Sequence, residues 1–267
     1  MPALPGRVHG KPSRLKRRIL ESNGIRQRHY AIDAEHRTTI GNGAMAARAG
    51  EDCLQGLMRI WFDFERQLGR VPVIQRLERG RFPLEDYRRL LLHLRQQVVE
   101  GARWITRGAS SFDRDFADVR SLVIEHVREE HRDYELLEAD YVAAGGERRA
   151  IVEGERNAGS EALHAFMMYR ASQPNPVDLI GAMWIIEGLG QKMAADWARR
   201  VEAATGGDGG HTRFMRYHGE NDDAHLDKLY ALLDRVCRDA ADRRAILRTA
   251  RVVARLYALQ LEEVDHD

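Results

Sequence analysis

The chain has 267 residues, enough for one large domain, and its 43% hydrophobic and 31% charged residues are typical of a globular protein. The formal net charge is +1, so there is no strong basic field that would indicate binding to nucleic acid or to an anionic membrane. Two cysteines, Cys53 and Cys237, exclude a scaffold of several disulfides and a CxxC metal or redox motif.

Residues 1–45 are expected to form a partly irregular N-terminal arm. Prolines and glycines interrupt this segment at Pro2, Pro5, Gly6, Gly10 and Pro12. The stretch from Arg7 to Arg28 is rich in Lys and Arg, which is typical of a solvated arm. The sequence has neither the apolar stretch of a signal peptide nor a run of about 18 apolar residues. We therefore expect a cytoplasmic protein that does not interact with a membrane.

Residues 46–267 are predicted to form a helical domain. Apolar residues recur there at helical spacing, and no alternation typical of strands stands out. The expected helices cover residues 46–67, 85–108, 114–143, 155–171, 177–203, 211–236 and 239–262. We therefore predict an all-α bundle of about seven helices.

The strongest candidate for chemistry is the segment that carries His218, Asp222 and His225. These positions fall within an arc of about 60° on an α-helix, so two imidazoles and a carboxylate project from one face. Apolar neighbours continue the same stripe, which indicates that this face points toward the core. The set is a plausible ligand group for a divalent transition metal. The alternative is a polar stretch on the surface.

Glu187 lies inside the apolar run Ile180-Gly-Ala-Met-Trp-Ile-Ile-Glu187-Gly-Leu-Gly. An ionised carboxylate without a partner in such surroundings would cost several kcal/mol, so it needs a compensating group. A metal ion would compensate it, and so would a hydrogen bond or ion pair to a buried arginine.

The expected helix 114–143 carries His126, Glu130 and Asp133 on or beside its apolar stripe. Glu130 and Asp133 form an i, i+3 pair similar to the Glu-x-x-His pairs of carboxylate-bridged di-iron bundles, with Asp in place of His. Glu100 and His126 are weaker candidates for ligands. The alternative for this helix is a charged, solvated face. All these donors are oxygen or nitrogen atoms, which favours iron or manganese over zinc, and two adjacent ions would explain so many inward acids.

The spacing His218-x3-Asp222-x2-His225, with Glu187 upstream in its Trp-Ile-Ile-Glu-Gly-Leu-Gly helix, resembles the haem-oxygenase-like di-iron oxidases and oxygenases. The resemblance covers roughly residues 60–240. It implies a seven-helix haem-oxygenase-like fold without haem, and two iron ions that react with O2. Glu130 matches the glutamate of the earlier ligand helix. The family supplies a histidine shortly after that glutamate. Here the nearest positions hold His131 and Asp133, and helix phase favours Asp133. This departure leaves room for a degenerate, mononuclear or non-iron site.

The arm is similar, over about 40 residues, to the N-terminal segment of type III ketoacyl-carrier-protein synthases. The similarity lies in Ile19-Leu-Glu-Ser-Asn-Gly-Ile-Arg-Gln-Arg28 and in Ala44-Met-Ala-Ala-Arg-Ala. The region of the nucleophilic cysteine is absent, so condensing activity is not expected. This likeness suggests either relics of a fused ancestor or a carrier-protein or fatty-acyl context, in which the substrate is an acyl group linked to a carrier protein.

The sequence therefore predicts an O2-dependent iron oxidase or oxygenase that acts on a small organic acid, an amino-acid-like molecule or an acyl group. Two alternatives stay open. One is an acid–base enzyme without a cofactor, similar to the thiaminase-like and pyrroloquinoline-quinone-synthase-like proteins. The other is a non-catalytic helical scaffold. An irregular N-terminal arm together with large apolar faces favours a homodimer.

Overall fold

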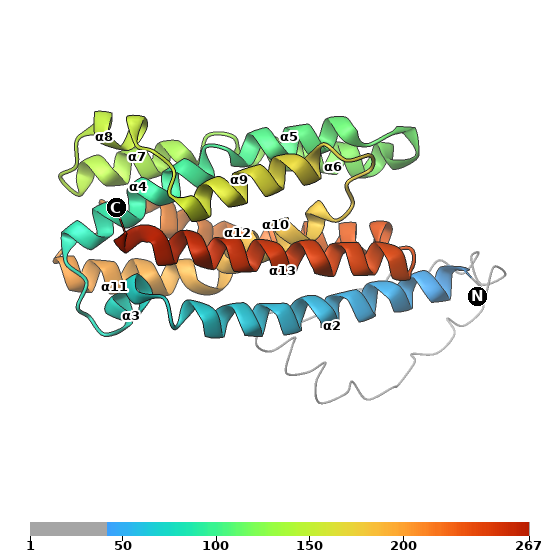
Figure 1. Ribbon diagram of the computed structural model, residues 1–267, viewed down its shortest axis with the longest axis horizontal. Coiled ribbons are helices and arrows are strands. Elements are labelled where there is room, and N and C mark those ends of the chain that lie inside the picture. Colours follow the sequence, from blue (N-terminus) through green and yellow to red (C-terminus); the bar gives the residue numbers. More distant parts are fainter. Residues whose placement is uncertain (1–41, 267) are drawn as a thin grey trace, which may run out of the picture. The chain divides into compact units, whose positions relative to one another are not determined.

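The computed structural model describes residues 42–266, without the side chains of residues 42–49 and 221–227. All regular structure in this range is helical (Figure 1). The α-helices are α2 (Asn42–Leu68), α3 (Pro72–Glu78), α4 (Leu84–Val98), α5 (Gly101–Ser111), α6 (Ala117–Glu130), α7 (Tyr134–Ala143), α8 (Arg148–Glu153), α9 (Ala158–Ala171), α10 (Leu179–Leu189), α11 (Ala195–Thr205), α12 (Arg213–Val236) and α13 (Ala240–Glu262). Two 3-10 turns, η2 (Arg114–Phe116) and η4 (Glu263–Asp265), and one π-helical segment, η3 (Gly190–Ala194), complete the order.

The prediction of an all-α bundle is confirmed, but three of the expected long helices are interrupted. The expected helix 85–108 divides into α4 and α5, and the expected helix 114–143 divides into η2, α6 and α7. The expected helix 177–203 contains η3 between α10 and α11. Two short helices, α3 and α8, occupy stretches in which no helix was expected. The predicted arm, residues 1–45, lies outside the described residues except for the first turn of α2.

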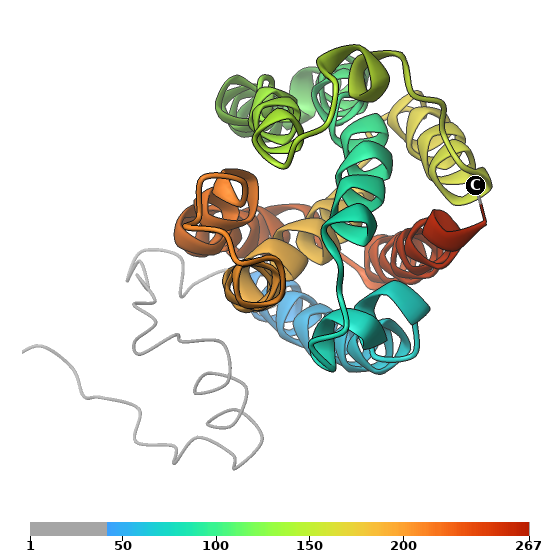
Figure 2. The ribbon, with the colours of Figure 1, turned by 90° about the vertical axis from the view of Figure 1, so that its left-hand side faces the viewer.

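Helix α10 is the central element of the bundle. It packs against α13 on one side and α12 on another (Figure 2). Nearly all of its side chains are buried. Gly181 explains the close approach to α13, because a Cβ atom there would lie 2.3 Å from the carbonyl oxygen of Ile246. Helices α2 and α13 run side by side along their length (Figure 1). Polar side chains on a helix that is buried on every side need partners inside the domain. The carboxylate of Glu187 on α10 is such a side chain.

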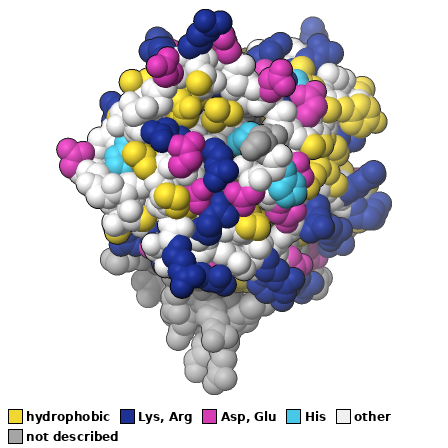
Figure 3. All heavy atoms as spheres, turned by 60° about the vertical axis from the view of Figure 1, so that its left-hand side comes forward, with side chains coloured by type: hydrophobic (Ala, Val, Ile, Leu, Met, Phe, Trp, Pro, Cys, Tyr) yellow, Lys and Arg dark blue, Asp and Glu magenta, His cyan; other side chains and the backbone are white. Residues whose placement is uncertain are grey.

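The surface of the described domain is polar and mixed in charge. Figure 3 shows one face on which basic and acidic side chains are interspersed, with hydrophobic side chains between them. This agrees with the near-zero net charge of the chain. Within residues 42–266, no helix combines the length and the apolar character that crossing a membrane requires.

Candidate metal centre

Two overlapping groups of potential metal ligands lie in the interior of the described domain. The His126 group consists of His126, Glu130 and Glu187, and the His218 group consists of Glu130, Asp133 and His218. Within each group one ligand atom per residue lies within 4.8 Å of the others. Glu130 belongs to both groups, which is the arrangement that a carboxylate bridging two ions requires.

Helix α6 supplies His126 and Glu130, and the turn that follows supplies Asp133. His126 and Glu130 are four residues apart and therefore project from the same face of α6. After Glu130 the backbone tightens, since the amide of Asp133 donates to the carbonyl of Glu130 at 3.2 Å and that of Leu136 donates to Asp133 at 3.1 Å. Side chains three residues apart are eclipsed in such 3-10 geometry. The interruption between α6 and α7 thus turns Asp133 to the same side as Glu130.

Helix α10 supplies Glu187, whose side chain is buried. Its Oε1 atom lies 3.3 Å from Nε2 of His126, so the carboxylate reaches across to α6. The π-helical segment Gly190–Ala194 begins one turn later. Such segments inside α-helices are frequent at functional sites because the extra residue changes which face the helix presents. Here Glu187, Gly190, Ala194 and Trp197 all line one cavity.

Helix α12 supplies His218. Its Nε2 atom lies 3.4 Å from Oδ2 of Asp133, and its ring packs against those of Phe214 and Tyr217, with centroid separations of 4.4 and 5.4 Å. The next residue, Gly219, allows α12 to approach the start of α11. A Cβ atom at Gly219 would lie 2.9 Å from Cβ of Ala195 and 3.0 Å from its amide nitrogen. Close helix contact at Gly219 therefore sets the depth at which His218 enters the interior.

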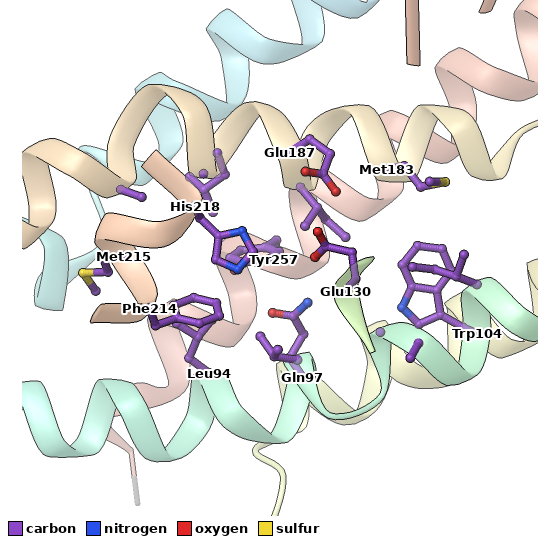
Figure 4. A pocket seen from close by; sticks show the side chains of 18 of the residues that line it. Leu94, Gln97, Trp104, Glu130, Met183, Glu187, Phe214, Met215, His218 and Tyr257 are labelled. Carbon is purple, nitrogen blue, oxygen red and sulfur yellow. The ribbon is translucent and has the colours of Figure 1, made fainter. Parts of the chain in front are cut away.

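Both groups border a cavity of about 110 Å³ (Figure 4). Its wall opposite Glu187 and His218 comes from α4 and α5, and includes Leu94, Gln97 and Trp104. Most of the lining is apolar. Tyr257 also borders the cavity, and burial raises the pKa of its phenol well above the usual value, which keeps it neutral. The cavity provides room for a substrate beside the ligand groups.

The charges of the groups fit a bound cation. Carboxylate oxygens of Glu130 and Glu187 lie within 4.8 Å of one another, and a cation between them would offset the repulsion of two carboxylates so close together. No Lys or Arg is among the described residues that line the cavity. Ligand atoms bound to one first-row ion at about 2.0–2.2 Å lie at most roughly 4.4 Å apart, so small side-chain shifts would close either group around an ion.

Three further ligands are predicted from the sequence, namely Asp222, His225 and Glu100. The side chains of Asp222 and His225 lie outside the described residues, although the backbone of α12 is helical there. Glu100 is buried, but it belongs to neither group: it pairs with Arg156 at 2.6 Å and Arg103 at 3.0 Å, and it lies 3.6 Å from His164. His126, a weaker candidate in the sequence, lies beside Glu187.

Gln97 borders the cavity and was not among the candidates from the sequence. It follows Leu90 and Leu94 at the i+7 and i+3 positions of their apolar stripe, which was a readable signal for an inward polar group. A neutral amide needs no counter-charge, so its place on an apolar stripe is a weaker signal than that of a carboxylate.

No protein-family model matches this chain, and no curated protein matches it either. Solved structures do match. A domain of unknown function with a haem-oxygenase-like fold from Shewanella denitrificans superimposes with a TM-score of 0.73 at 16% sequence identity, over 78% of this chain and 89% of that one. A TenA homologue from Pseudomonas syringae pv. tomato superimposes with a TM-score of 0.65 at 12% identity, over 80% of this chain and 93% of that one. At such low identities the likeness concerns the fold. The chain has the haem-oxygenase-like fold, as its sequence predicted.

Proposed function

We propose that this protein is an iron-dependent oxidase or oxygenase that holds two metal ions between α6, α10 and α12. The observation that carries the proposal is the position of Glu130, which belongs to both ligand groups. His126 and Glu187 would complete one coordination sphere, and Asp133 and His218 the other. A donor set of carboxylates and imidazoles without thiolates favours iron or manganese. Asp222 and His225, from the predicted motif on α12, are proposed as further ligands.

Bound iron would supply the redox chemistry with O2 that amino-acid side chains lack. The described residues would do the rest. The histidines and carboxylates position the ions, and the apolar wall that includes Leu94 and Trp104 excludes bulk water from the reaction space. The substrate would occupy the cavity between α4 and α10 (Figure 4).

Anaerobic reconstitution with Fe(II), followed by removal of loosely bound metal, tests the proposal. The wild-type protein should retain close to two equivalents of iron and consume O2. Glu187→Ala and His218→Ala should each retain less. Glu100→Gln is the matched control, because Glu100 is equally buried but pairs with Arg156 away from both groups. Wild-type protein without retained iron, or unchanged iron content in Glu187→Ala and His218→Ala, would contradict the proposal.

A second candidate function is acid–base catalysis without a metal. It is supported by the two contacts between an imidazole and a carboxylate, His126 with Glu187 and His218 with Asp133, and by the fold shared with a TenA homologue. A histidine positioned by a carboxylate can transfer protons. Metal content separates the two candidates: an acid–base enzyme would keep its activity after complete chelation, whereas the iron enzyme would lose it.

A further inference from the structure

The cavity beside the ligand groups has a lining that restricts the class of substrate. Its apolar wall combines aliphatic and aromatic side chains from six helices, among them Leu94, Trp104, Met183, Trp197, Phe214 and Leu261. The charged or titratable side chains that border it, apart from the neutral Tyr257, are His126, Glu130, Glu187 and His218. All four belong to the ligand groups. The rest of the cavity therefore offers no counter-ion to a charged substrate.

A substrate charge in the apolar part of this cavity would be costly. An ionised group taken from water into an apolar site without a partner costs several kcal/mol, even after the surroundings relax. No Lys or Arg of the described residues lines the cavity to offset a carboxylate, and no carboxylate outside the ligand groups lines it to offset an ammonium. The part of the substrate away from the ligand groups must then be uncharged.

Gln97 adds one specific polar requirement. Figure 4 shows its side chain extending from α4 into the cavity, toward Glu130 and His218. The Oε1 atom of Gln97 is buried and accepts no hydrogen bond from the described residues. A buried acceptor left in this state costs about 1–3 kcal/mol. A donor on the bound molecule would remove that cost, and the donor would lie close to the ligand groups.

We infer that the site takes an organic molecule that is uncharged and mainly apolar away from the ligand groups, and whose hydroxyl or N–H group donates a hydrogen bond to Oε1 of Gln97. The inference rests on the proposed function in placing the reaction in this cavity. It narrows the substrate classes predicted from the sequence toward compounds with an apolar acyl or alkyl part that carries no charge. Gln97 is then a residue that selects and positions the substrate without taking part in the redox chemistry.

Three six-carbon probes test the inference: 1-hexanol, 1-fluorohexane, which cannot donate a hydrogen bond, and hexanoate, which is charged. Binding would be followed by tryptophan fluorescence, since Trp104 and Trp197 line the cavity. Each probe is titrated into iron-loaded protein and into chelator-treated protein. In the chelator-treated protein we expect 1-hexanol to bind most tightly and hexanoate most weakly, and in the iron-loaded protein we expect 1-hexanol to bind more tightly than 1-fluorohexane. Because binding to the chelator-treated form needs no metal, failure of the iron proposal would leave this result intact.

Gln97→Leu supplies the decisive comparison. It should weaken the binding of 1-hexanol by about two- to tenfold, the effect expected when one hydrogen bond is lost. The affinity for 1-fluorohexane should not change. The variant should be at least as stable as the wild type, because it removes a buried acceptor that no described residue satisfies. Gln67→Leu is the matched control, since Gln67 contacts Glu262 and does not line the cavity. Equal binding of 1-hexanol to the wild type and to Gln97→Leu would overturn the role of Gln97.

A second pair of variants tests the cavity itself. Val98→Trp should fill part of the space and reduce the affinity for 1-hexanol, whereas Val252→Trp, at a half-buried position outside the lining, should not. Two results would overturn the inferred class of ligand. One is that 1-hexanol binds to neither form of the protein, and the other is that hexanoate binds more tightly than 1-hexanol to the chelator-treated form.

Discussion

The Nε2 atom of His126 lies 3.3 Å from Oε1 of Glu187, so that α6 and α10 meet through a histidine and a carboxylate in the interior of the domain. A similar contact, from His218 to Asp133 at 3.4 Å, joins α12 to the turn after α6. Glu130 belongs both to the His126 group and to the His218 group. The candidate site therefore depends on one helix end, at residues 126–133, more than on any other segment.

Replacement of Glu130 should weaken both metal positions. We expect Glu130→Ala to lower the affinity for both ions by at least about tenfold, since loss of even an outer partner costs roughly 10–100-fold. His126→Ala should affect mainly one ion. Metal analysis after dialysis measures the stoichiometry. Glu129→Gln is the control, because the Glu129 carboxylate pairs with Lys228 at 2.8 Å and belongs to neither ligand group. Loss of a single ion in Glu130→Ala would show that Glu130 does not bridge.

A side chain at position 219 should destabilise the protein. In Gly219→Ala the new Cβ atom meets the Ala195 backbone at 3.0 Å, so α12 must move away from α11 and take His218 with it. We expect a loss of about 1–3 kcal/mol of unfolding free energy, together with reduced retention of iron. Thermal and denaturant unfolding measure the first effect, and metal analysis the second.

Gly101→Ala is the matched control for this variant. A Cβ atom at Gly101 meets no other atom within 4 Å, and the residue lies in the first turn of α5. Its replacement should be neutral or should stabilise the protein by up to about 1 kcal/mol, through the reduced freedom of the unfolded chain. If both variants lose the same stability, close packing at Gly219 is not the cause.

The pair between Arg76 and Asp265 should make part of the stability dependent on pH. Arg76 donates two hydrogen bonds to Asp265, at 2.6 and 2.9 Å, and these hold the pKa of that carboxyl below its usual value. A carboxyl with a lowered pKa in the folded state stabilises the protein above its unfolded pKa, and this contribution is lost as the pH falls through the folded pKa. Asp265→Asn should therefore cost about 1 kcal/mol at pH 7 and progressively less below about pH 4.

Denaturant unfolding between pH 7 and pH 3 would measure this difference. Asp63→Asn serves as the comparison, because Asp63 pairs with Arg66 at the surface, where both side chains are about 70% exposed. That variant should change stability by only a few tenths of a kcal/mol at any pH. A constant difference between the wild type and Asp265→Asn over the whole range would show that the charge of Asp265 contributes nothing.

The sequence by itself determined the fold class, because helical periodicity is a local property of the chain. It also identified Glu187, since a carboxylate inside an apolar run needs compensation wherever the helix lies. Apolar stripes do not report where a helix is interrupted. The turn at residues 131–133 and the π-helical segment at Gly190–Ala194 were both missed, and these two interruptions orient Asp133 and the residues after Glu187.

Only the tertiary structure decided which donors meet. His126 and Glu100 were ranked alike from the sequence, yet His126 faces Glu187 while Glu100 pairs with Arg156. The difference arises from the rotation and depth of each helix against its neighbours, which depend on close contacts such as Gly219 on Ala195 and Gly181 on Ile246. Such contacts join residues far apart in the chain, so no local pattern contains them. The acids that face the interior could therefore be predicted from the sequence. The packing of the bundle, by contrast, decided that Glu130 belongs to both ligand groups.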